Sequence, residues 1–426
     1  MKVKFITLGC KTNLYESDAM AKLFSEKGYE ITDKTADVYV INTCIVTGTG
    51  AHKSRQEIRR AVKENPDAVI AVTGCFAQVS PSEAAAIEGV DIVCGISEKG
   101  KITDLVEDVL KLRRQIVLCP DISEQKEFEE ISLTSYRARI RANLKIEDGC
   151  NSFCSYCIIP YARGRVRSRK IEKIREESEL LFKNGYREIV LTGIHIGSYG
   201  KDLDDDISLI DVLETVSSSA SGARIRLGSI EPNTITEEFV SRAKILKNLC
   251  PQFHLSLQSG CGETLKRMNR KYTPNEYRAA VNRLRDAFPN AAITTDLMVG
   301  FPGETEEEFN ESFEFCREIG FSQMHIFKYS PREGTRAAAF PNQIENRVKE
   351  SRSHKMLALA KKMKEDFYAR FKGCKVTVLA EQQKDGIYHS TTPNYMDIYF
   401  KSDLDLSGKF VSLILDGKGN GKTEES

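Results

Sequence analysis

Three cysteines in the middle of the chain carry the most specific chemical signal in the sequence. Cys150, Cys154 and Cys157 are spaced as C-x3-C-x2-C. Three thiolates can bind three irons of a four-iron cube and leave the fourth iron open to a substrate. A structural zinc site needs a fourth cysteine or histidine nearby, and the closest histidine, His195, lies well downstream. The spacing therefore predicts a catalytic iron-sulfur cluster, with structural zinc as the alternative.

A second set of cysteines follows the predicted strands of the N-terminal region. Cys10, Cys44 and Cys75 each come directly after a short apolar run, and more than thirty residues separate each from the next. Because parallel strands end at the same edge of a sheet, we expect these thiols to converge there and to bind metal. Cys94 follows a fourth predicted strand, and the spacing alone leaves it as a further candidate. The alternative is that all four are small buried residues at strand ends.

The elements that must position these thiols alternate strands with helices. Up to about residue 115, short β-branched runs separated by helical stretches predict parallel βαβ units. From residue 142 the alternation resumes, and six strands with helices between them predict a partial (β/α)6 barrel. Active sites of such barrels lie at the carboxyl ends of the strands, and Cys150 follows the first one. The barrel strands are predicted at residues 144–147, 188–191, 224–227, 253–257, 293–298 and 324–327.

The predicted fold class is α/β with a small all-β unit at the C-terminus. A long charged helix is predicted over residues 343–371, and the short strands after it are typical of a small antiparallel β-barrel. The expected domains are a parallel α/β domain at residues 1–118, a linker at 119–141, the barrel at 142–365 and the small antiparallel β-barrel at 366–426.

Composition narrows the environment of the protein. The chain has 62 Lys and Arg against 61 Asp and Glu, so a nucleic-acid partner must be held by local basic patches. No apolar run approaches the roughly 20 residues that cross a bilayer, so we expect no membrane contact and a cytoplasmic location. The 12 cysteines are expected to stay reduced there and to serve metal or redox chemistry.

Two rows of alternating arginines flank the predicted barrel entrance. In an extended segment, alternate residues point to one face, and such a row suits the phosphates of a nucleic acid. The alternative is a solvated edge strand whose charges block aggregation. The first row is Arg137, Arg139 and Arg141, and the second is Arg163, Arg165, Arg167 and Arg169.

The spacing of Cys150, Cys154 and Cys157 resembles the signature of the radical S-adenosylmethionine superfamily. With Cys10, Cys44 and Cys75 the resemblance covers essentially the whole chain and sharpens to the methylthiotransferase family. It implies two 4Fe-4S clusters, one on each set of three cysteines, with all six residues catalytic. It also implies that the C-terminal unit is a TRAM RNA-binding domain. Cys94 falls outside the motif and is not an implied ligand.

The resemblance also suggests where S-adenosylmethionine binds. Segments at the predicted barrel mouth suit the bound cofactor, because glycine lets a backbone come close to a ligand. Tight turns between strand and helix are the alternative for each of these segments. The candidate contacts are Gly193, His195, Glu231 and Gly300.

The residues after the first cysteine separate the branches of the family. Lys11-Thr12-Asn13 resembles the branch that acts on N6-threonylcarbamoyladenosine, and so does the stretch from Asp148 to Gly164. This implies a tRNA methylthiotransferase that adds a methylthio group to C2 of that nucleoside at position 37, next to the anticodon. Implied partners are tRNA, S-adenosylmethionine and a reducing electron carrier. The alternatives are the isopentenyladenosine enzyme of the same family and a noncatalytic, metal-stabilised RNA-binding protein.

Overall fold

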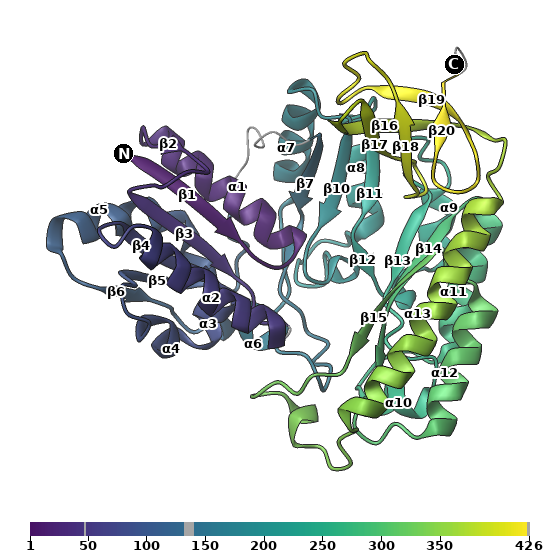
Figure 1. Cartoon of the computed structure of the whole chain (residues 1–426), viewed down its shortest axis with the longest axis horizontal. Helices are drawn as coiled ribbons and strands as arrows, with labels where there is room; N and C mark the ends of the chain where they lie inside the picture. The colour runs from purple at the N-terminus through teal and green to yellow at the C-terminus, as the bar shows by residue number, and fades with distance from the viewer. Residues whose placement is uncertain (47, 132–139, 424–426) are drawn as a thin grey trace.

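The computed structural model describes residues 1–46, 48–131 and 140–423 of the chain. An N-terminal α/β lobe lies beside a larger barrel, and a small C-terminal sheet covers one end of that barrel (Figure 1). Among the described residues, no helix combines the length and the apolar character needed to span a membrane.

The N-terminal lobe is built on a parallel sheet with the strand order β2-β1-β3-β4-β5-β6. Every residue of β3 and β4 is buried, which explains why these strands are continuous apolar runs in the sequence. The predicted strands β1, β3, β4 and β5 are confirmed, whereas β2 and β6 are too short to show a period. The strands are β1 (Lys2–Thr7), β2 (Glu30–Ile31), β3 (Val38–Thr43), β4 (Val69–Gly74), β5 (Ile92–Cys94) and β6 (Ile116–Leu118).

Helices cover both faces of this sheet, as expected for βαβ units (Figure 1). The helix α1 begins directly after Cys10 and lies between the sheet and the barrel. The helices are α1 (Lys11–Glu26), α2 (Gly48–Glu64), α3 (Cys75–Val79), α4 (Pro81–Ala85) and α5 (Ile102–Leu112), with a 3-10 turn at Ile96–Lys101.

The barrel has strands at the six predicted positions. All of these strands are parallel, and the barrel wall is open between the first strand and the last. Two sheets with orders β11-β10-β7 and β12-β13-β14-β15 make up the wall. The short strands β11 and β12 together fill the third of the six positions, and Gly228 separates them. The strands are β7 (Arg141–Lys145), β10 (Glu188–Thr192), β11 (Arg224–Leu227), β12 (Ser229–Ile230), β13 (Gln252–Leu255), β14 (Ala292–Val299) and β15 (Gln323–Lys328).

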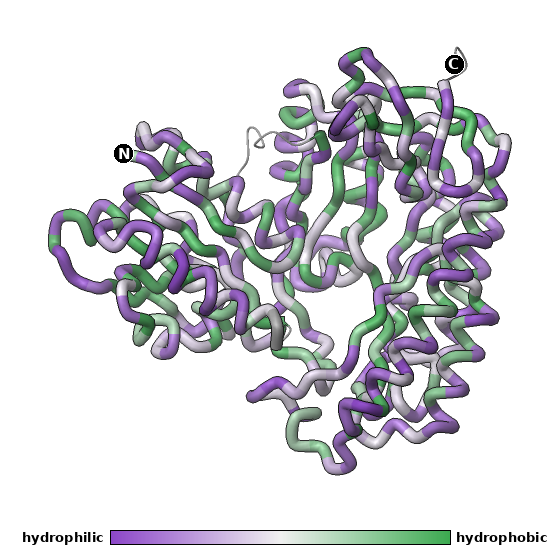
Figure 2. The backbone as a smooth tube through the Cα atoms, viewed as in Figure 1, coloured by the Kyte–Doolittle hydropathy of each residue, from purple (hydrophilic) through white to green (hydrophobic). Residues whose placement is uncertain are grey.

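The barrel helices form an outer layer whose solvent side is hydrophilic, while the strands are mainly hydrophobic (Figure 2). The helices predicted between the barrel strands are present. Both α11 and α12 begin with a capping box, in which Thr273 pairs with Glu276 and Thr305 with Glu308. The helices are α6 (Ile159–Arg163), α7 (Ile171–Lys183), α8 (Leu209–Ser219), α9 (Glu237–Ala243), α10 (Gly262–Arg267), α11 (Pro274–Ala287) and α12 (Glu306–Ile319).

The C-terminal region is an antiparallel sheet with the order β18-β17-β16-β19-β20. A bridge between Tyr399 and Asn420 joins its two edge strands, so the sheet nearly closes into the expected small barrel. The long predicted helix is α13 (Asn346–Ala369), which contributes Met356 to the barrel core and Phe367 to the core of this sheet. The strands are β16 (Lys375–Lys384), β17 (Ile387–Thr391), β18 (Asp397–Lys401), β19 (Phe410–Leu415) and β20 (Gly421–Lys422).

Buried arginines join the C-terminal sheet to the amino ends of the barrel strands. Arg226 is 1% exposed and pairs with Glu188 at 2.8 Å. The same guanidinium donates to the carbonyl oxygens of Thr392 and Pro393, at 3.2 and 3.0 Å. This contact fixes the sheet at the end of the barrel opposite the cysteine loop.

The predicted phosphate contact of Arg141 is wrong. Its guanidinium donates to Glu381 of the C-terminal sheet at 2.6 Å and lies 3.7 Å from Glu188. These two carboxylates neutralise the positive charge that a phosphate would need to bind. Arg137 and Arg139, the other members of that row, lie outside the described residues.

We predict that Arg226→Met destabilises the whole chain. The substitution leaves the carboxylate of Glu188, which is 0% exposed, without its main partner. Breaking a buried pair in this way costs about 3–5 kcal/mol of unfolding free energy, measurable by chemical denaturation. The double variant Arg226→Met with Glu188→Gln should recover part of the loss. Equal stability of the wild type and the single variant would contradict the prediction.

Candidate functional site

The loop that carries Cys150, Cys154 and Cys157 begins with a turn that only glycine can make. Gly149 has φ +89°, and a Cβ atom there would lie 1.9 Å from the carbonyl oxygen of Arg165. The N–H of Cys150 donates to the carbonyl of Gly164 at 3.0 Å. The loop therefore leaves β7 and is pinned at once against the segment that follows α6.

Segments far away in the sequence hold the rest of the loop. The Asn269 side chain donates to the carbonyl of Phe153 at 2.9 Å, and the N–H of Ser155 donates to that of Met268 at 3.0 Å. The carbonyl of Ser155 in turn accepts from the N–H of Ala337 at 2.8 Å. The loop is thus fixed by residues that follow β13 and β15, on the opposite side of the barrel.

The thiols of this loop lie in an electropositive setting. Burial raises the pKa of Cys154, and Arg270, whose Nη1 lies 3.3 Å from its Sγ, opposes the rise. Burial raises the pKa of Cys157 to about 12, and the charges of the other two thiols add to the rise. Burial also acts against the thiolate of Cys150, but the interactions with His195 and Ser152 together outweigh it, and the pKa is lowered. Metal binding must release the remaining protons.

His195, Glu231 and Arg270 form a charged group beside the loop. Nε2 of His195 lies 3.3 Å from Oε2 of Glu231, and Nη2 of Arg270 lies 3.0 Å from Oε1 of the same carboxylate. Burial opposes protonation of His195, but hydrogen bonds to Cys150 and Glu231 raise its pKa to about 10. Burial also acts against the Glu231 carboxylate, which His195 and Arg270 overcome, lowering its pKa to about 2. Both groups are therefore charged at neutral pH.

A cavity of about 480 Å³ opens beside this group. His195 and Glu231 line it together with Asn151 and Ser152 of the cysteine loop and Thr234. The cavity thus brings two of the four predicted cofactor contacts together with the loop.

Gly193 and Gly300, the other two predicted cofactor contacts, do not line this cavity. A Cβ atom at Gly193 would lie 2.7 Å from Glu147, and one at Gly300 would lie 2.3 Å from Lys349. These close approaches are packing reasons for glycine at both turns.

Glu147 organises the turn before His195 and was not predicted from the sequence. Its Oε2 accepts from the N–H groups of Ile194 and His195, at 2.9 and 2.7 Å. Burial raises the pKa of this carboxyl to about 8, although the N–H of His195 opposes the rise. Its position at the end of the first barrel strand, directly before the cysteine loop, is the signal that could have identified it.

The N-terminal thiols converge as the strand order requires. Cys10, Cys44 and Cys75 follow β1, β3 and β4, which are neighbours in the sheet. A Cβ atom on Gly9 would lie 3.1 Å from the Sγ of Cys44, so the first two loops touch. Burial, together with the charges of Cys10 and Cys44, raises the pKa of Cys75 to about 11. The three thiols therefore share one electrostatic environment.

Cys94 lies apart from this set. It is 0% exposed, and its thiol donates to the carbonyl of Gly95 at 3.6 Å. Burial raises its pKa, with Glu129 as the largest charged influence. The structure thus supports a packing role for this cysteine.

A buried ion network joins the two cysteine sets. Glu16 of α1 accepts from Lys145 of β7 at 2.8 Å and pairs with Arg163 of α6 and with Lys99. Asp148 accepts from Lys145 at 2.7 Å and lies 3.1 Å from Arg163. All five side chains are at most 4% exposed. Three cations face two carboxylates, and the charge of Arg163 opposes the burial that raises the pKa of Cys75.

The predicted phosphate contacts of Arg163, Arg167 and Arg169 are therefore wrong. Each is buried, and their acidic partners are Asp148 for the first two and Glu177, at 2.7 Å, for Arg169. The alternation in sequence is real, but the segment is covered by α1 and α7 instead of facing solvent. Arg165 alone in this row is exposed, and it stacks on the ring of Phe153 at 4.7 Å.

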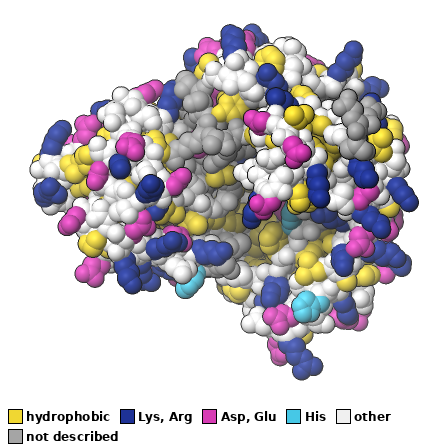
Figure 3. Space-filling view, turned by 45° about the horizontal axis from the view of Figure 1, so that its top comes forward, with side chains coloured by type: hydrophobic (Ala, Val, Ile, Leu, Met, Phe, Trp, Pro, Cys, Tyr) yellow, Lys and Arg dark blue, Asp and Glu magenta, His cyan; other side chains and the backbone are white. Residues whose placement is uncertain are grey.

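One loop of the barrel lies close to both cysteine sets. Figure 3 shows a recess between the N-terminal lobe and the barrel. Burial raises the pKa of Cys44, and Arg163 and Arg332, the latter from the loop after β15, oppose the rise. In the same loop, a Cβ atom on Gly334 would lie 3.5 Å from Ile158, next to Cys157. The loop after β15 therefore passes close to both sets.

The thiols are not spaced for a single metal ion. Among the described residues, only His254, Asp296 and His325 form a group of three Cys, His, Asp or Glu donors whose ligand atoms lie within 4.8 Å of one another. Each cysteine set is more widely spread while sharing one electrostatic environment, which fits a multi-iron cluster better than zinc.

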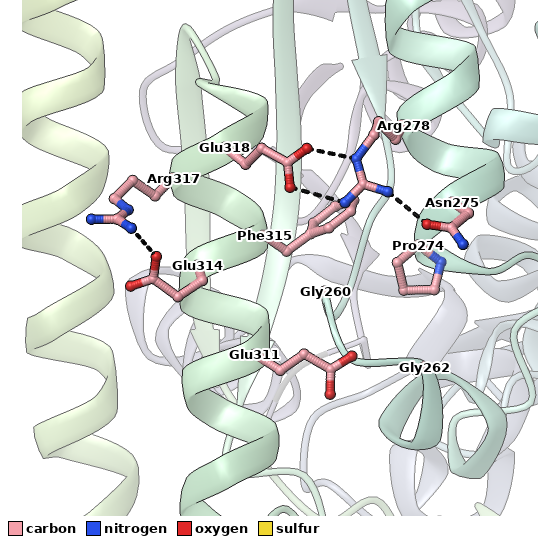
Figure 4. A pocket seen from close by; sticks show the side chains of 10 residues that line it. All are labelled: Gly260, Gly262, Pro274, Asn275, Arg278, Glu311, Glu314, Phe315, Arg317 and Glu318. Carbon is pink, nitrogen blue, oxygen red and sulfur yellow. Dashed lines mark hydrogen bonds and ion pairs between the residues drawn. The ribbon is translucent and has the colours of Figure 1, made fainter.

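A second concavity lies on the outer surface, away from the thiols. It has a volume of about 740 Å³ between α11 and α12, and no cysteine lines it. Arg278 pairs there with Glu318 and donates to Asn275, so its polar groups are satisfied within the protein (Figure 4). We assign the site to the cysteine loops.

Comparison with protein families divides the chain as the thiols do. Residues 144–316 match the Radical SAM superfamily, and residues 2–95 match the family described as uncharacterized protein family UPF0004. Each match contains one of the two cysteine sets.

Several curated proteins are similar over nearly the whole chain. Threonylcarbamoyladenosine tRNA methylthiotransferase MtaB of Bacillus subtilis (strain 168) is 43% identical over 96% of this chain and 93% of its own length. The protein of the same name from Aquifex aeolicus (strain VF5) is 38% identical over 97% and 100%. The tRNA-2-methylthio-N(6)-dimethylallyladenosine synthase of Caldicellulosiruptor saccharolyticus is 32% identical over 96% and 88%.

A solved structure supports the fold. The radical S-adenosylmethionine methyltransferase TsrM from Kitasatospora setae superposes with a TM-score of 0.61, covering 79% of this chain and 77% of its own. Its sequence identity is 14%, so the likeness concerns the fold alone.

We predict that Arg163→Met weakens both the fold and metal retention at the N-terminal thiols. The variant leaves Glu16 and Asp148 with less compensation inside the protein, which costs about 3–5 kcal/mol of unfolding free energy. It also removes the cation that favours the Cys75 thiolate. Chemical denaturation and iron content after anaerobic reconstitution measure the two effects.

Arg165→Met, two residues along the chain, is the matched control. Because Arg165 is exposed, the unfolding free energy should change by no more than about 0.5 kcal/mol. Affinity for tRNA should fall, with the slope of log affinity against log salt reduced by about one. The assignment of the two arginines is wrong if both variants behave alike.

Proposed function

We propose that this chain adds a methylthio group to C2 of N6-threonylcarbamoyladenosine. It belongs to the radical S-adenosylmethionine family of threonylcarbamoyladenosine tRNA methylthiotransferases. The target is position 37 of tRNA, next to the anticodon. The observation that carries the proposal is the pair of converging three-thiol sets, both close to the loop after β15. Replacing hydrogen on an aromatic carbon without useful acidity requires radical chemistry, which the barrel set suits.

The six thiols are proposed to hold two 4Fe-4S clusters. Cys150, Cys154 and Cys157 would hold one, and Cys10, Cys44 and Cys75 the other, each with one iron free of protein ligand. When bound, the barrel cluster supplies the electron that cleaves S-adenosylmethionine, and the N-terminal cluster supplies a site for the sulfur to be methylated. The chain itself contributes the cationic surroundings, through Arg270 at the first set and Arg163 at the second.

The cavity beside the barrel loop is proposed to bind S-adenosylmethionine. The amino-acid end of that molecule carries one ammonium and one carboxylate group. The cavity offers a protonated imidazole on His195 and an ionised carboxylate on Glu231, which complement these two charges. Glu147 holds the His195 backbone in place, and Arg270 holds Glu231.

The tRNA is proposed to contact the exposed rim of the recess and the C-terminal sheet. The reaction is proposed to take place in the cytoplasm. Arg165 and Phe153 offer a charge and a ring at the cysteine loop, and Tyr399 is 48% exposed on β18. Tyr388 is 1% exposed and stacks on Phe400, so it serves the core. We assign residues 1–118 to the N-terminal cluster, 142–365 to the radical reaction and 366–426 to RNA binding as a TRAM domain, with 119–141 as the linker. The electrons are proposed to come from an external reducing carrier.

Two observations favour this substrate over the alternatives. Lys11-Thr12-Asn13 follows the first cysteine, and the threonylcarbamoyladenosine enzymes named above are 43% and 38% identical, against 32% for the dimethylallyladenosine enzyme. A noncatalytic RNA-binding role would not need charged, cavity-lining groups beside a thiol loop.

We predict that Cys75→Ala separates the two reactions. It should leave reductive cleavage of S-adenosylmethionine intact, because the barrel thiols are untouched, and it should abolish methylthio transfer. Cys157→Ala should abolish both activities, and Cys374→Ala, at an exposed thiol, should abolish neither. Product analysis by mass spectrometry on reconstituted protein measures all three, and transfer by the Cys75 variant would remove the case for a second catalytic cluster.

We further predict the substrate from purified components. The reconstituted protein should contain about eight irons per chain. It should form the 2-methylthio product on tRNA that carries threonylcarbamoyladenosine and not on tRNA that carries isopentenyladenosine. The reverse preference would assign the chain to the other branch. Zinc at both thiol sets without cleavage of S-adenosylmethionine would support the noncatalytic alternative.

A further inference from the structure

The inner wall of the barrel carries three metal-binding side chains that neither cysteine set uses. His254 on β13, Asp296 on β14 and His325 on β15 lie on neighbouring strands, and we call them the lumen triad. One ligand atom from each lies within 4.8 Å of the other two. Within residues 1–46, 48–131 and 140–423, no other three Cys, His, Asp or Glu side chains meet this distance.

The strand register places the triad on the face that points into the barrel. His254 is paired with Thr294, and Asp296 with His325. Since side chains two residues apart on a strand share a face, all four point the same way. The alternate residue Leu297 is 0% exposed and belongs to the core between strands and helices. The triad therefore faces the lumen, four residues or fewer below the ends of its strands.

The first histidine of the triad is held in an orientation that suits a ligand. Nδ1 of His254 lies 3.0 Å from the hydroxyl of Thr294, and Nε2 lies 3.3 Å from Oδ2 of Asp296. When the hydroxyl oxygen accepts a hydrogen bond from Nδ1–H, the lone pair of Nε2 faces the carboxylate. A second hydrogen bond of this kind is the usual support of a metal-bound histidine.

The second histidine distinguishes the triad from a simple ion pair. Nε2 of His254 faces Asp296, while the ring nitrogens of His325 have no hydrogen-bond partner in the described part of the chain. The two rings lie 6.0 Å apart between centroids.

We propose that the lumen triad binds one divalent first-row transition metal ion, of the class of Zn²⁺ or Fe²⁺. Two imidazoles and one carboxylate are a ligand set that such ions prefer, and the single carboxylate favours a cation over an anion. Three protein ligands leave coordination positions open towards the lumen, where water or an oxygen atom of a molecule bound in the barrel completes the shell. The proposal does not depend on the function proposed above.

Zinc uptake by the full-length protein with reconstituted clusters tests the proposal. Anaerobic equilibrium dialysis against Zn²⁺, with zinc and iron counted separately by mass spectrometry, should show one zinc per chain and no loss of iron. His325→Ala and Asp296→Asn should lose this zinc, and Thr294→Val should weaken its affinity about 10- to 100-fold. The control His354→Ala, at an exposed position on α13, should bind zinc as the wild type does.

The outcomes separate the metal from other uses of the same residues. Equal zinc uptake by the wild type, His325→Ala and Asp296→Asn would show adventitious binding and overturn the proposal. Uptake accompanied by iron loss would place the zinc at the cysteines and overturn it too. Absence of zinc together with slower methylthio transfer by His325→Ala would assign the triad to substrate contact instead. An anomalous peak at the triad above the zinc edge, absent below it, would confirm the site in crystals.

Discussion

The buried ion network of Glu16, Asp148, Lys99, Lys145 and Arg163 is the constraint on which the rest of the molecule depends. Charges in a protein interior are tolerated only when their partners are held in place. Here the partners come from α1, β7, α6 and the turn before α5, so the N-terminal lobe and the barrel can fold against each other in one arrangement. That arrangement brings the strand ends of both lobes, and therefore both sets of thiols, to the same recess.

The two ends of the barrel use charge in different ways. At the carboxyl ends of the strands, cations exceed carboxylates around the thiols, which suits ligands that must lose protons to bind metal. At the amino ends, Arg141 and Arg226 are neutralised by Glu188, Glu381 and backbone carbonyls, and their role is to attach the C-terminal sheet. The same residue type thus serves chemistry at one end and assembly at the other.

Local patterns in the sequence predicted most of the fold and the cysteine sites. The spacing of Cys150, Cys154 and Cys157 is a property of eight consecutive residues, and Cys10, Cys44 and Cys75 could be joined because strand ends share an edge. The contacts of Arg270 with Cys154 and of Glu16 with Arg163 could not be found in this way, since each joins residues more than a hundred positions apart. Arg141, Arg163, Arg167 and Arg169 were misjudged for the same reason. Arg163 ends α6 instead of lying in an extended strand, and only its contact with Glu16 of α1 shows that it is buried.

The anchoring of the cysteine loop has a consequence for the order in which the protein matures. Cys150, Cys154 and Cys157 are synthesised early, yet their loop takes its shape from backbone contacts with Met268 and Ala337. Until the ribosome has released the chain beyond these residues, the loop lacks the groups that hold it. We therefore expect the loop to hold iron most firmly in a nearly complete polypeptide, and less firmly in a chain truncated before the last barrel strand.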